Sequence, residues 1–153
     1  MTAADALDLG PRRVARRRSV ALAPEAIYAM LIDPRRHHEL DGSGTVQPGV
    51  RGPERLALGD AFSVAMRLGP IRYRMRNTVT AQEQNRLLEW RLPAGHRWRW
   101  ELAPAPGGGT VVTEIFDYRA SPAARIFEAL GIPAKNARGI EHTLARLAER
   151  PAD

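Results

Sequence analysis

The sequence predicts an α+β fold in which a curved antiparallel sheet of about seven strands wraps around one long C-terminal helix. Apolar and polar residues alternate in several runs between residues 60 and 118, as they do in strands with one buried face. Near the C-terminus, Ala137, Ile140, Leu144 and Leu147 recur at spacings of three and four, which define one helical face. The 153-residue chain has no cysteine and suits one domain without disulfides.

The first strand is predicted in the stretch RRVARRRSVAL, where Val14, Val20 and Leu22 share one face. Arg16 and Arg18 fall on the same inner parity, which favours a charged edge of the sheet or the mouth of a pocket.

The segment before this strand, residues 1–11, is short and polar and ends at Gly10-Pro11. Such a segment is expected to be a mobile N-terminal tail. Residues 12–150 are then expected to form a single domain.

Two short helices are expected between the first and second strands. Pro24 suits the first turn of a helix, and Glu25 faces the positive end of its dipole. Asp33-Pro34 ends this helix and can cap a second one over the stretch RRHHEL.

The remaining strands are separated by turn signals rich in glycine and proline, such as Gly69-Pro70 and the stretch PAPGGGT. A cap at Ser121-Pro122 opens the last helical region, and Gly131-Ile132-Pro133 breaks or bends it. Gly42 and Gly44 permit the tight backbone that returns the chain to a strand after the two short helices. Further strands are predicted over Asp60 to Leu68, Ile71 to Thr80, Leu87 to Leu92, His96 to Leu102 and Thr110 to Tyr118.

The net charge of +6 raises the possibility of a nucleic-acid partner. However, only one of the 23 basic residues, Lys135, is a lysine, and the chain is rich in Ala, Gly and Pro. Coding bias toward GC-rich codons is therefore a sufficient alternative explanation for much of the arginine content, and no specific nucleic-acid partner is expected. No apolar run approaches the ~20 residues of a membrane helix. The N-terminus lacks the layout of a signal peptide. We therefore expect a cytoplasmic protein without membrane insertion, of open oligomeric state.

The stretch HRWRWEL has two interpretations. Arginines and tryptophans together could bind single-stranded nucleic acid. Alternatively, a half-buried strand turns its even-numbered residues toward the helix, where the two rings either fill the core or line a pocket. The alternation favours the second interpretation, because it puts the arginines on the opposite face from the rings. The convex face would then carry one arginine ridge, made of Arg72, Arg74, Arg76, Arg97 and Arg99.

Several strings resemble the START-like SRPBCC superfamily, also called the polyketide cyclase/dehydrase and lipid-transport superfamily. They are SVALAPEAIYAMLIDPRRHHELDGSGTV, LALGDAFSVAM, HRWRWEL, GGGTVVTEIFDY and GIPAKNARGIEHTLARL, and the resemblance spans Arg12 to Glu149. The chain is most similar to the bacterial single-domain members. The resemblance implies a helix-grip fold with a ligand cavity between the sheet and the C-terminal helix. Its functional implication is broad, because the superfamily includes carriers, cyclases, dehydrases, chaperone-ATPase activators and quinone-binding proteins.

The expected function is binding of a hydrophobic or aromatic small molecule, polyketide-like or lipid-like, with cyclase or dehydrase activity as an open option. The alternative is a protein- or RNA-binding module that uses the arginine ridge. Lining residues expected from strand parity and the helical face are Phe62, Met66, Tyr73, Met75, Asn77, Trp90, Trp98, Trp100, Phe116, Ile140 and Leu144, with Ile126 and Phe127 as a further part of the roof.

His96 and Glu114 are the candidate catalytic residues, because two titrating groups in one apolar pocket can act as a general acid and base. The last strand has two possible phases. Inward-facing Val112, Glu114 and Phe116 are chosen by analogy with the family pattern, and the other phase stays open. A satisfied structural cluster, or Glu114 outside beside the arginines, is the alternative to a catalytic pair.

Other sites are disfavoured by the sequence. The nucleophile elbow G-x-S-x-G is absent, so Asp41 and Ser43 are not expected to form a hydrolase triad with His37 or His38. The DGSG segment is expected instead to be a loop at the pocket entrance. The adjacent pair His37-His38 diverges on a helix, and the chain has no H-E-x-x-H motif, so no metal is expected. Gly107-Gly108-Gly109 connects two strands and is not a phosphate loop, and no cofactor is expected.

Overall fold

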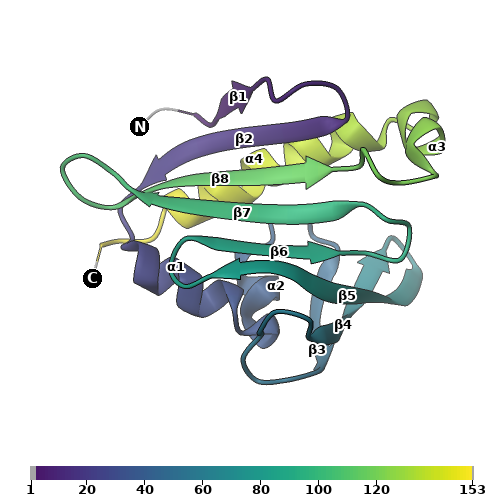
Figure 1. The fold of residues 1–153 in the computed structure, drawn as a ribbon, viewed down its shortest axis with the longest axis horizontal. Helices are drawn as coiled ribbons and strands as arrows, with labels where there is room; N and C mark the ends of the chain where they lie inside the picture. The colour runs from purple at the N-terminus through teal and green to yellow at the C-terminus, as the bar shows by residue number, and fades with distance from the viewer. Residues whose placement is uncertain (1–2, 153) are drawn as a thin grey trace.

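The computed structural model describes residues 3–152 and has a curved antiparallel sheet that holds one long helix (Figure 1). The strands are β1 (Asp5–Leu7), β2 (Arg13–Val20), β3 (Val46–Arg51), β4 (Ala61–Leu68), β5 (Ile71–Glu83), β6 (Leu87–Arg91), β7 (Arg97–Pro104) and β8 (Thr110–Asp117). The helical elements are α1 (Pro24–Leu31), the 3-10 turn η1 (Pro34–Arg36), α2 (His37–Leu40), α3 (Ala124–Ala129) and α4 (Ile132–Ala148).

The strands form one sheet in the order β1-β2-β8-β7-β6-β5-β4-β3, and every neighbouring pair is antiparallel. The predicted fold class is confirmed, with eight strands in place of about seven. The short β1 lies within residues 1–11 and pairs with β2, where the sequence predicts a tail. A segment of three residues gives almost no periodicity, which explains why the sequence pattern does not reveal this strand. The mobility of residues 1–11 stays a prediction.

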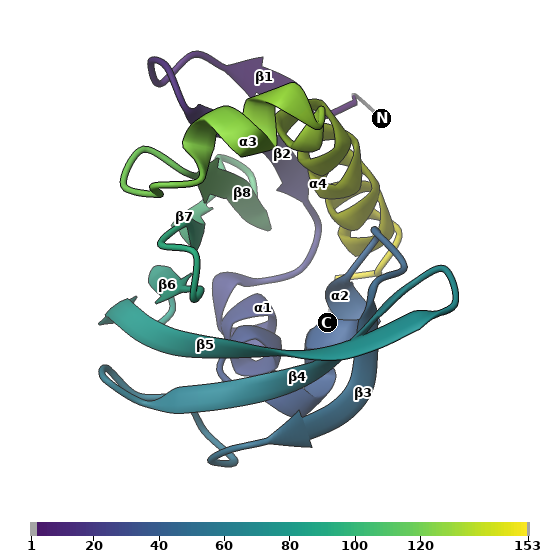
Figure 2. The same cartoon turned by 90° about the vertical axis from the view of Figure 1, so that its right-hand side faces the viewer.

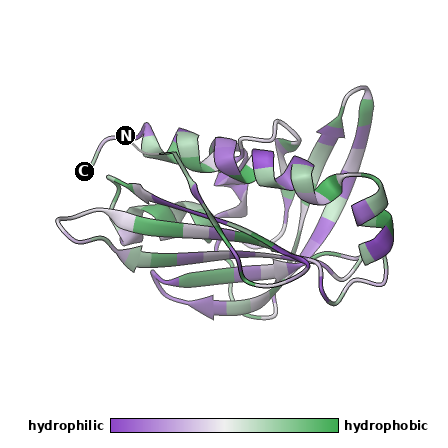
Figure 3. Cartoon of the chain, turned by 90° about the horizontal axis from the view of Figure 1, so that it is seen from above, coloured by the Kyte–Doolittle hydropathy of each residue, from purple (hydrophilic) through white to green (hydrophobic). Residues whose placement is uncertain are grey.

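Helix α4 lies across the concave side of the sheet and packs mainly against β2, with further contacts to β8 (Figure 2). Its predicted apolar face is confirmed, since Ala137, Ile140, Leu144 and Leu147 are all buried. Polar residues occupy the opposite face, so the hydropathy colours alternate along the helix and along the strands (Figure 3).

Helices α3 and α4 are separated at Gly131, as predicted from the Gly-Ile-Pro sequence. Gly131 has φ of 71°, a left-handed conformation that ends α3 at little steric cost, and Pro133 occupies the first turn of α4. Because of this break, α4 can follow the sheet while α3 lies over one end of the curved sheet (Figure 2).

The expectation of a single arginine ridge is wrong. Arg72 to Arg76 belong to β5 and Arg97 and Arg99 to β7, and β6 lies between these two strands. Glu89 of β6 binds both Arg97 Nη1, at 3.1 Å, and Arg99 Nη1, at 3.2 Å. The sequence could not show this separation, because the alternation of residues within a strand does not reveal which strands are neighbours.

Among the described residues, none of the helices combines the length and the apolar character that crossing a bilayer requires.

Candidate ligand-binding site

Glu114 lies on the concave face of β8, opposite Trp100 of β7. Of the two phases left open for this strand, the structure has the one with Val112, Glu114 and Phe116 inward. Val112 and Phe116 belong to the buried apolar core, and Glu114 is 7% exposed between them. A carboxyl group is therefore placed on the apolar side of the sheet.

Within the described part of the chain, Glu114 Oε1 is buried without a hydrogen-bond partner. Burial raises the pKa of Glu114 well above its ordinary value of 4.5, and the charge of Asp41 raises it further. A buried polar group without a partner destabilises a fold by about 1–3 kcal/mol, so such a group needs an explanation. A protonated carboxyl offers both an O–H donor and an acceptor to a molecule that enters this site.

Arg16 of β2 is the cross-strand neighbour of Glu114 on its other side, yet it does not neutralise Glu114. Arg16 Nε donates instead to Glu141 Oε2 of α4 at 2.8 Å. Arg16 thereby ties β2 to α4 from the inner face of the sheet. Arg16 therefore does not compensate the carboxyl group of Glu114.

Glu89 provides the contrast, because it is equally buried, at 6% exposure, but faces the other side of the sheet. Its carboxylate accepts hydrogen bonds from Thr80 Oγ1, Arg97 Nη1 and Arg99 Nη1. The carboxylate of Glu89 is therefore hydrogen-bonded within the protein, whereas Oε1 of Glu114 has no partner among the described residues.

His96 lies among aromatic rings at the end of the concave face near α3. Its ring centroid is 5.6 Å from that of Phe116 and 5.2 Å from that of Phe127, both in edge-on geometry. Burial lowers the pKa of His96 from 6.5 to about 4, so the imidazole is neutral near pH 7. Its Nδ1 is a second buried atom without a hydrogen-bond partner in the described chain.

His96 and Glu114 do not meet as the predicted acid/base pair. Arg97 pairs with Asp117 and Trp100 with Glu114, so His96 lies four residues along β7 from the partner of Glu114. At ~3.3 Å per residue the two groups are on the order of 13 Å apart. The parity was predicted correctly, but the distance depends on the register between β7 and β8, which the sequence does not reveal.

The neutrality of His96 can be measured directly. We expect the NMR signals of its imidazole nitrogens to stay at neutral-tautomer values down to about pH 5, because burial disfavours the cation. The same residue in the urea-unfolded chain should titrate near ~6.5. Since only the unfolded state gains the proton in this range, His96 lowers stability as pH falls from about 6.5 toward 4. A folded-state midpoint near 6.5 would show that the ring is solvated.

Trp90 and Trp98 form a cross-strand pair, and each of them packs against a different set of rings. Trp90 stacks on His37 at 5.1 Å and meets Phe62 edge-on at 6.0 Å. Trp98 packs on Phe116 at 5.2 Å. Trp90 and Trp98 remain partly exposed although they face the core. The part of each tryptophan ring that the core does not cover is available to an apolar ligand.

The other predicted lining residues divide by exposure. Tyr73 is on the concave parity but is 37% exposed, because it lies on the part of β5 that pairs only with β4. Ile126 is 60% exposed on α3 and does not roof the site, whereas Phe127 does contact the aromatic group. Phe62, Asn77, Trp100, Phe116, Ile140 and Leu144 are buried, while Met66 and Met75 are partly buried.

Two further residues were missed by sequence reasoning. His37 is buried, its Nε2 lies 2.6 Å from the carbonyl oxygen of Leu31, and burial lowers its pKa. Tyr28 of α1 is 2% exposed, and its hydroxyl has no partner among the described residues. Tyr28 is buried on α1 together with Ile27, Met30 and Leu31, and only the packing shows that its hydroxyl is enclosed.

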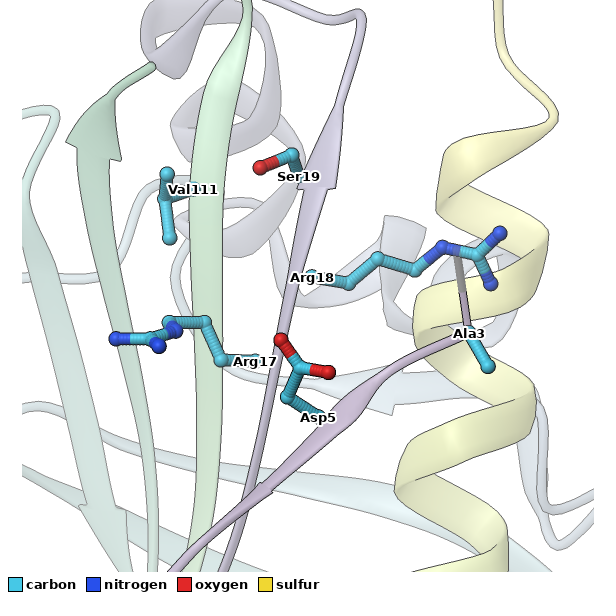
Figure 4. A pocket seen from close by; sticks show the side chains of 6 residues that line it. All are labelled: Ala3, Asp5, Arg17, Arg18, Ser19 and Val111. Atoms are coloured by element: carbon cyan, nitrogen blue, oxygen red, sulfur yellow. The ribbon is translucent and has the colours of Figure 1, made fainter. Parts of the chain in front are cut away.

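Two surface pockets lie away from the space between α4 and the sheet. One, of about 280 Å³, is at the β1–β2 edge, where Arg17 and Arg18 point to opposite sides of β2 and Asp5 lies beside them (Figure 4). The other, of about 500 Å³, lies between β3 and the β4–β5 hairpin. The ligand cavity between the sheet and α4 therefore stays a prediction.

The DGSG loop docks on α4. Gly42 N donates to Thr143 Oγ1 at 2.8 Å, and a Cβ at Gly42 would lie 2.4 Å from Thr143 N, so only glycine fits. Asp41 accepts hydrogen bonds from Ser43 and Gly44, which folds the loop on itself. Within residues 3–152, no three His, Asp or Glu side chains gather as a metal site would require.

A curved antiparallel sheet that wraps around one helix defines a helix-grip ligand-binding domain. Its concave face carries aromatic rings and a buried carboxyl oxygen that has no partner within residues 3–152. The chain belongs to the polyketide cyclase/dehydrase and lipid-transport family, whose profile matches residues 11–151. The predicted resemblance is thereby confirmed.

Relatives and solved structures agree with this assignment. Rv0088 of Mycobacterium tuberculosis is 45% identical over 150 residues, which cover 95% of this chain and 67% of that protein. A solution structure of a protein from Arthrobacter aurescens has a TM-score of 0.70 at 17% identity, covering 97% of this chain and 92% of the other. A crystal structure of a protein from Rhodobacter sphaeroides has a TM-score of 0.69 at 18% identity, covering 95% of each chain. At such identities these structures support the fold alone.

Proposed function

We propose that the concave face binds a neutral apolar or aromatic small molecule whose polar group, a carbonyl or hydroxyl, hydrogen-bonds to Glu114. The observation that carries this proposal is the carboxyl of Glu114, buried on the apolar face without a partner for Oε1 in the described chain. Its raised pKa favours a neutral ligand, because a carboxylic acid can donate to a carbonyl without burying a net charge.

The aromatic surface supports the same choice of ligand. Trp90 and Trp98 form a cross-strand pair, and each is only partly buried where it packs against the core. Flat rings contribute favourable stacking with aromatic ligands and cover large apolar areas. A polyketide-like molecule, which carries rings and carbonyl groups, combines the two features that this face would recognise.

Cyclase or dehydrase activity is the finer form of this proposal. Glu114 would act as general acid toward the bound carbonyl, and neutral His96 would act at the far end of an extended ligand, since the two groups are too distant to exchange a proton directly. Once a substrate is known, Glu114→Gln should reduce turnover by ~10²-fold or more while affinity stays within a few-fold. Binding without any turnover in the wild type would support a carrier instead.

Native mass spectrometry of freshly purified protein tests ligand binding directly, because a retained molecule appears as added mass whatever its identity. We expect an adduct that is released by denaturation and that is depleted in Glu114→Leu purified in parallel. Glu101→Leu is the matched control, because Glu101 lies on β7 with its side chain bound to Arg99 on the other face. The bare chain mass in the wild type, together with no binding of a hydrophobic fluorescent probe, would contradict the proposal.

Trp98→Ala should weaken binding of a naphthalene-type probe by about tenfold, because it removes one of the two partly buried tryptophan rings. It should also reduce the free energy of unfolding by about 2 kcal/mol, less than for a fully buried ring. Leu130→Ala, at a 70% exposed position, serves as control and should change neither quantity. Unchanged probe affinity in Trp98→Ala would remove this tryptophan from the site.

A further inference from the structure

The hairpin formed by β4 and β5 extends past the rest of the sheet. β5 pairs with β6 only from Thr78 onward, so residues 71–77 are paired with β4 alone (Figure 2). The tip of this hairpin is the sequence Leu-Gly-Pro-Ile at residues 68–71. Leu68 is 46% exposed and Ile71 is 60% exposed. Leu68 and Ile71 are cross-strand partners, so they form one apolar patch at the projecting tip, and such patches are typical of interaction sites.

Arginines flank this apolar tip in a regular arrangement. Arg67 and Arg72 form a cross-strand pair directly behind Leu68 and Ile71, and Arg74 follows two residues later. Residues 61–80 contain four arginines and no acidic residue. Among the described residues, no ion pair involves these arginines. Arg67 and Arg74 donate only to the carbonyl oxygens of Gly69 and Gly49.

The arginines also line a hollow beside the tip. The pocket of about 500 Å³ between β3 and the hairpin includes Arg67, Arg72 and Arg74 in its wall, together with the exposed ring of Tyr73. This arrangement matches the layers of a membrane surface. The tip is apolar and uncharged, and the tyrosine and the arginines lie behind it at similar distances from the tip. Apolar groups enter the acyl boundary, and Tyr and Arg lie at the headgroups.

We propose that the β4–β5 hairpin is a peripheral docking site for anionic phospholipid membranes. Leu68 and Ile71 dip into the acyl boundary, and the guanidinium groups of Arg67, Arg72 and Arg74 bind lipid phosphates. The hairpin is long enough for this, because Arg74 lies about 10 Å from the tip at ~3.3 Å per residue, and interfacial elements enter the bilayer by about 5–10 Å. The contact needs no spanning helix and is separate from the ligand proposal.

Sedimentation with sucrose-loaded vesicles tests the proposal. The protein should bind vesicles of phosphatidylcholine mixed with phosphatidylglycerol at least ~10-fold more tightly than vesicles of phosphatidylcholine alone. Leu68→Gln/Ile71→Gln should reduce the partition coefficient by about tenfold or more. Arg72→Gln/Arg74→Gln should reduce it by about fivefold per charge, and binding should weaken with added salt.

The control variant Leu58→Gln/Arg86→Gln changes the same residue types at the opposite end of β5. Leu58 is 65% exposed, and its backbone N–H donates to Gln82 near that end. This variant should bind vesicles like the wild type. Glu114→Leu should also bind them normally, so the failure of the ligand proposal and of the docking proposal are distinguishable.

Insertion of the tip can be observed directly, because the chain has no cysteine and Ile71→Cys offers a unique labelling site. An environment-sensitive dye at this position should shift to the blue with anionic vesicles, whereas the same dye at Leu58→Cys should not. Equal binding to neutral and anionic vesicles, or an unshifted tip dye, would overturn the proposal. Self-association that buries the tip in solution, or binding to RNA without binding to vesicles, would also overturn it.

Discussion

Glu114→Leu should make the protein more stable and at the same time remove most of its ligand affinity. Leucine fills the site without a polar atom, so the desolvation penalty at Oε1 disappears and the free energy of unfolding should rise by about 1–3 kcal/mol. The polar group of the ligand then has no partner, which should reduce affinity by about 10–100-fold. Urea denaturation and probe titration of the same samples measure both effects.

The pH dependence of stability identifies the origin of that gain. The pKa of Glu114 is raised in the folded protein above its ordinary value of 4.5, so the folded state holds this proton more tightly than the unfolded state. Proton binding by Glu114 therefore stabilises the folded state fully below about pH 4.5, and this stabilisation is lost as pH rises through the raised pKa. The difference between Glu114→Leu and wild type should grow over this range. A gain that is the same at all pH values would contradict the assignment to a buried carboxyl.

Glu89→Leu should have the opposite effect, although Glu89 is as buried as Glu114. Removing its carboxylate leaves Thr80, Arg97 and Arg99 without their shared acceptor. Breaking a buried ion pair costs about 3–5 kcal/mol, and the partial exposure of both arginines reduces the expected loss to about 2–3 kcal/mol.

Equilibrium unfolding of Glu89→Leu checks this expectation, with Glu101→Leu as control. Glu101 binds Arg99 at 2.7 Å, but its side chain is 45% exposed, so its loss should change stability by less than about 1 kcal/mol. Equal effects of Glu89→Leu and Glu114→Leu would mean that the two faces of the sheet do not differ as described.

The order of elements was predictable because each signal is local. The alternation in HRWRWEL, the repeat from Ala137 to Leu147 and the break at Gly131 each depend on neighbouring residues, and all three are borne out. The three-residue β1 gave no such signal, since its strand character comes from pairing with β2. Local patterns therefore predicted that the sheet wraps around the helix, but they did not reveal the edge strand β1.

The candidate site was predictable only in part. Parity predicted the concave face for His96, and analogy with the family pattern favoured it for Glu114, but their separation depends on the register between β7 and β8. The pairing of Arg16 with Glu141 joins residues 125 positions apart, and this choice of partner leaves Glu114 uncompensated. Such long-range choices are made by packing in three dimensions, which a single sequence does not encode in any local pattern.

We propose above all that the concave face selects a neutral polar group on an apolar ligand through Glu114. Competition of 2-acetylnaphthalene and 2-naphthoate for a bound fluorescent probe at neutral pH tests it, because the two molecules share a ring system and differ in charge. The wild type should bind the ketone at least ~10-fold more tightly than the carboxylate, and Glu114→Leu should lose most of its affinity for the ketone. Equal or tighter binding of the carboxylate in the wild type, or ketone binding that is unchanged in Glu114→Leu, would contradict the claim.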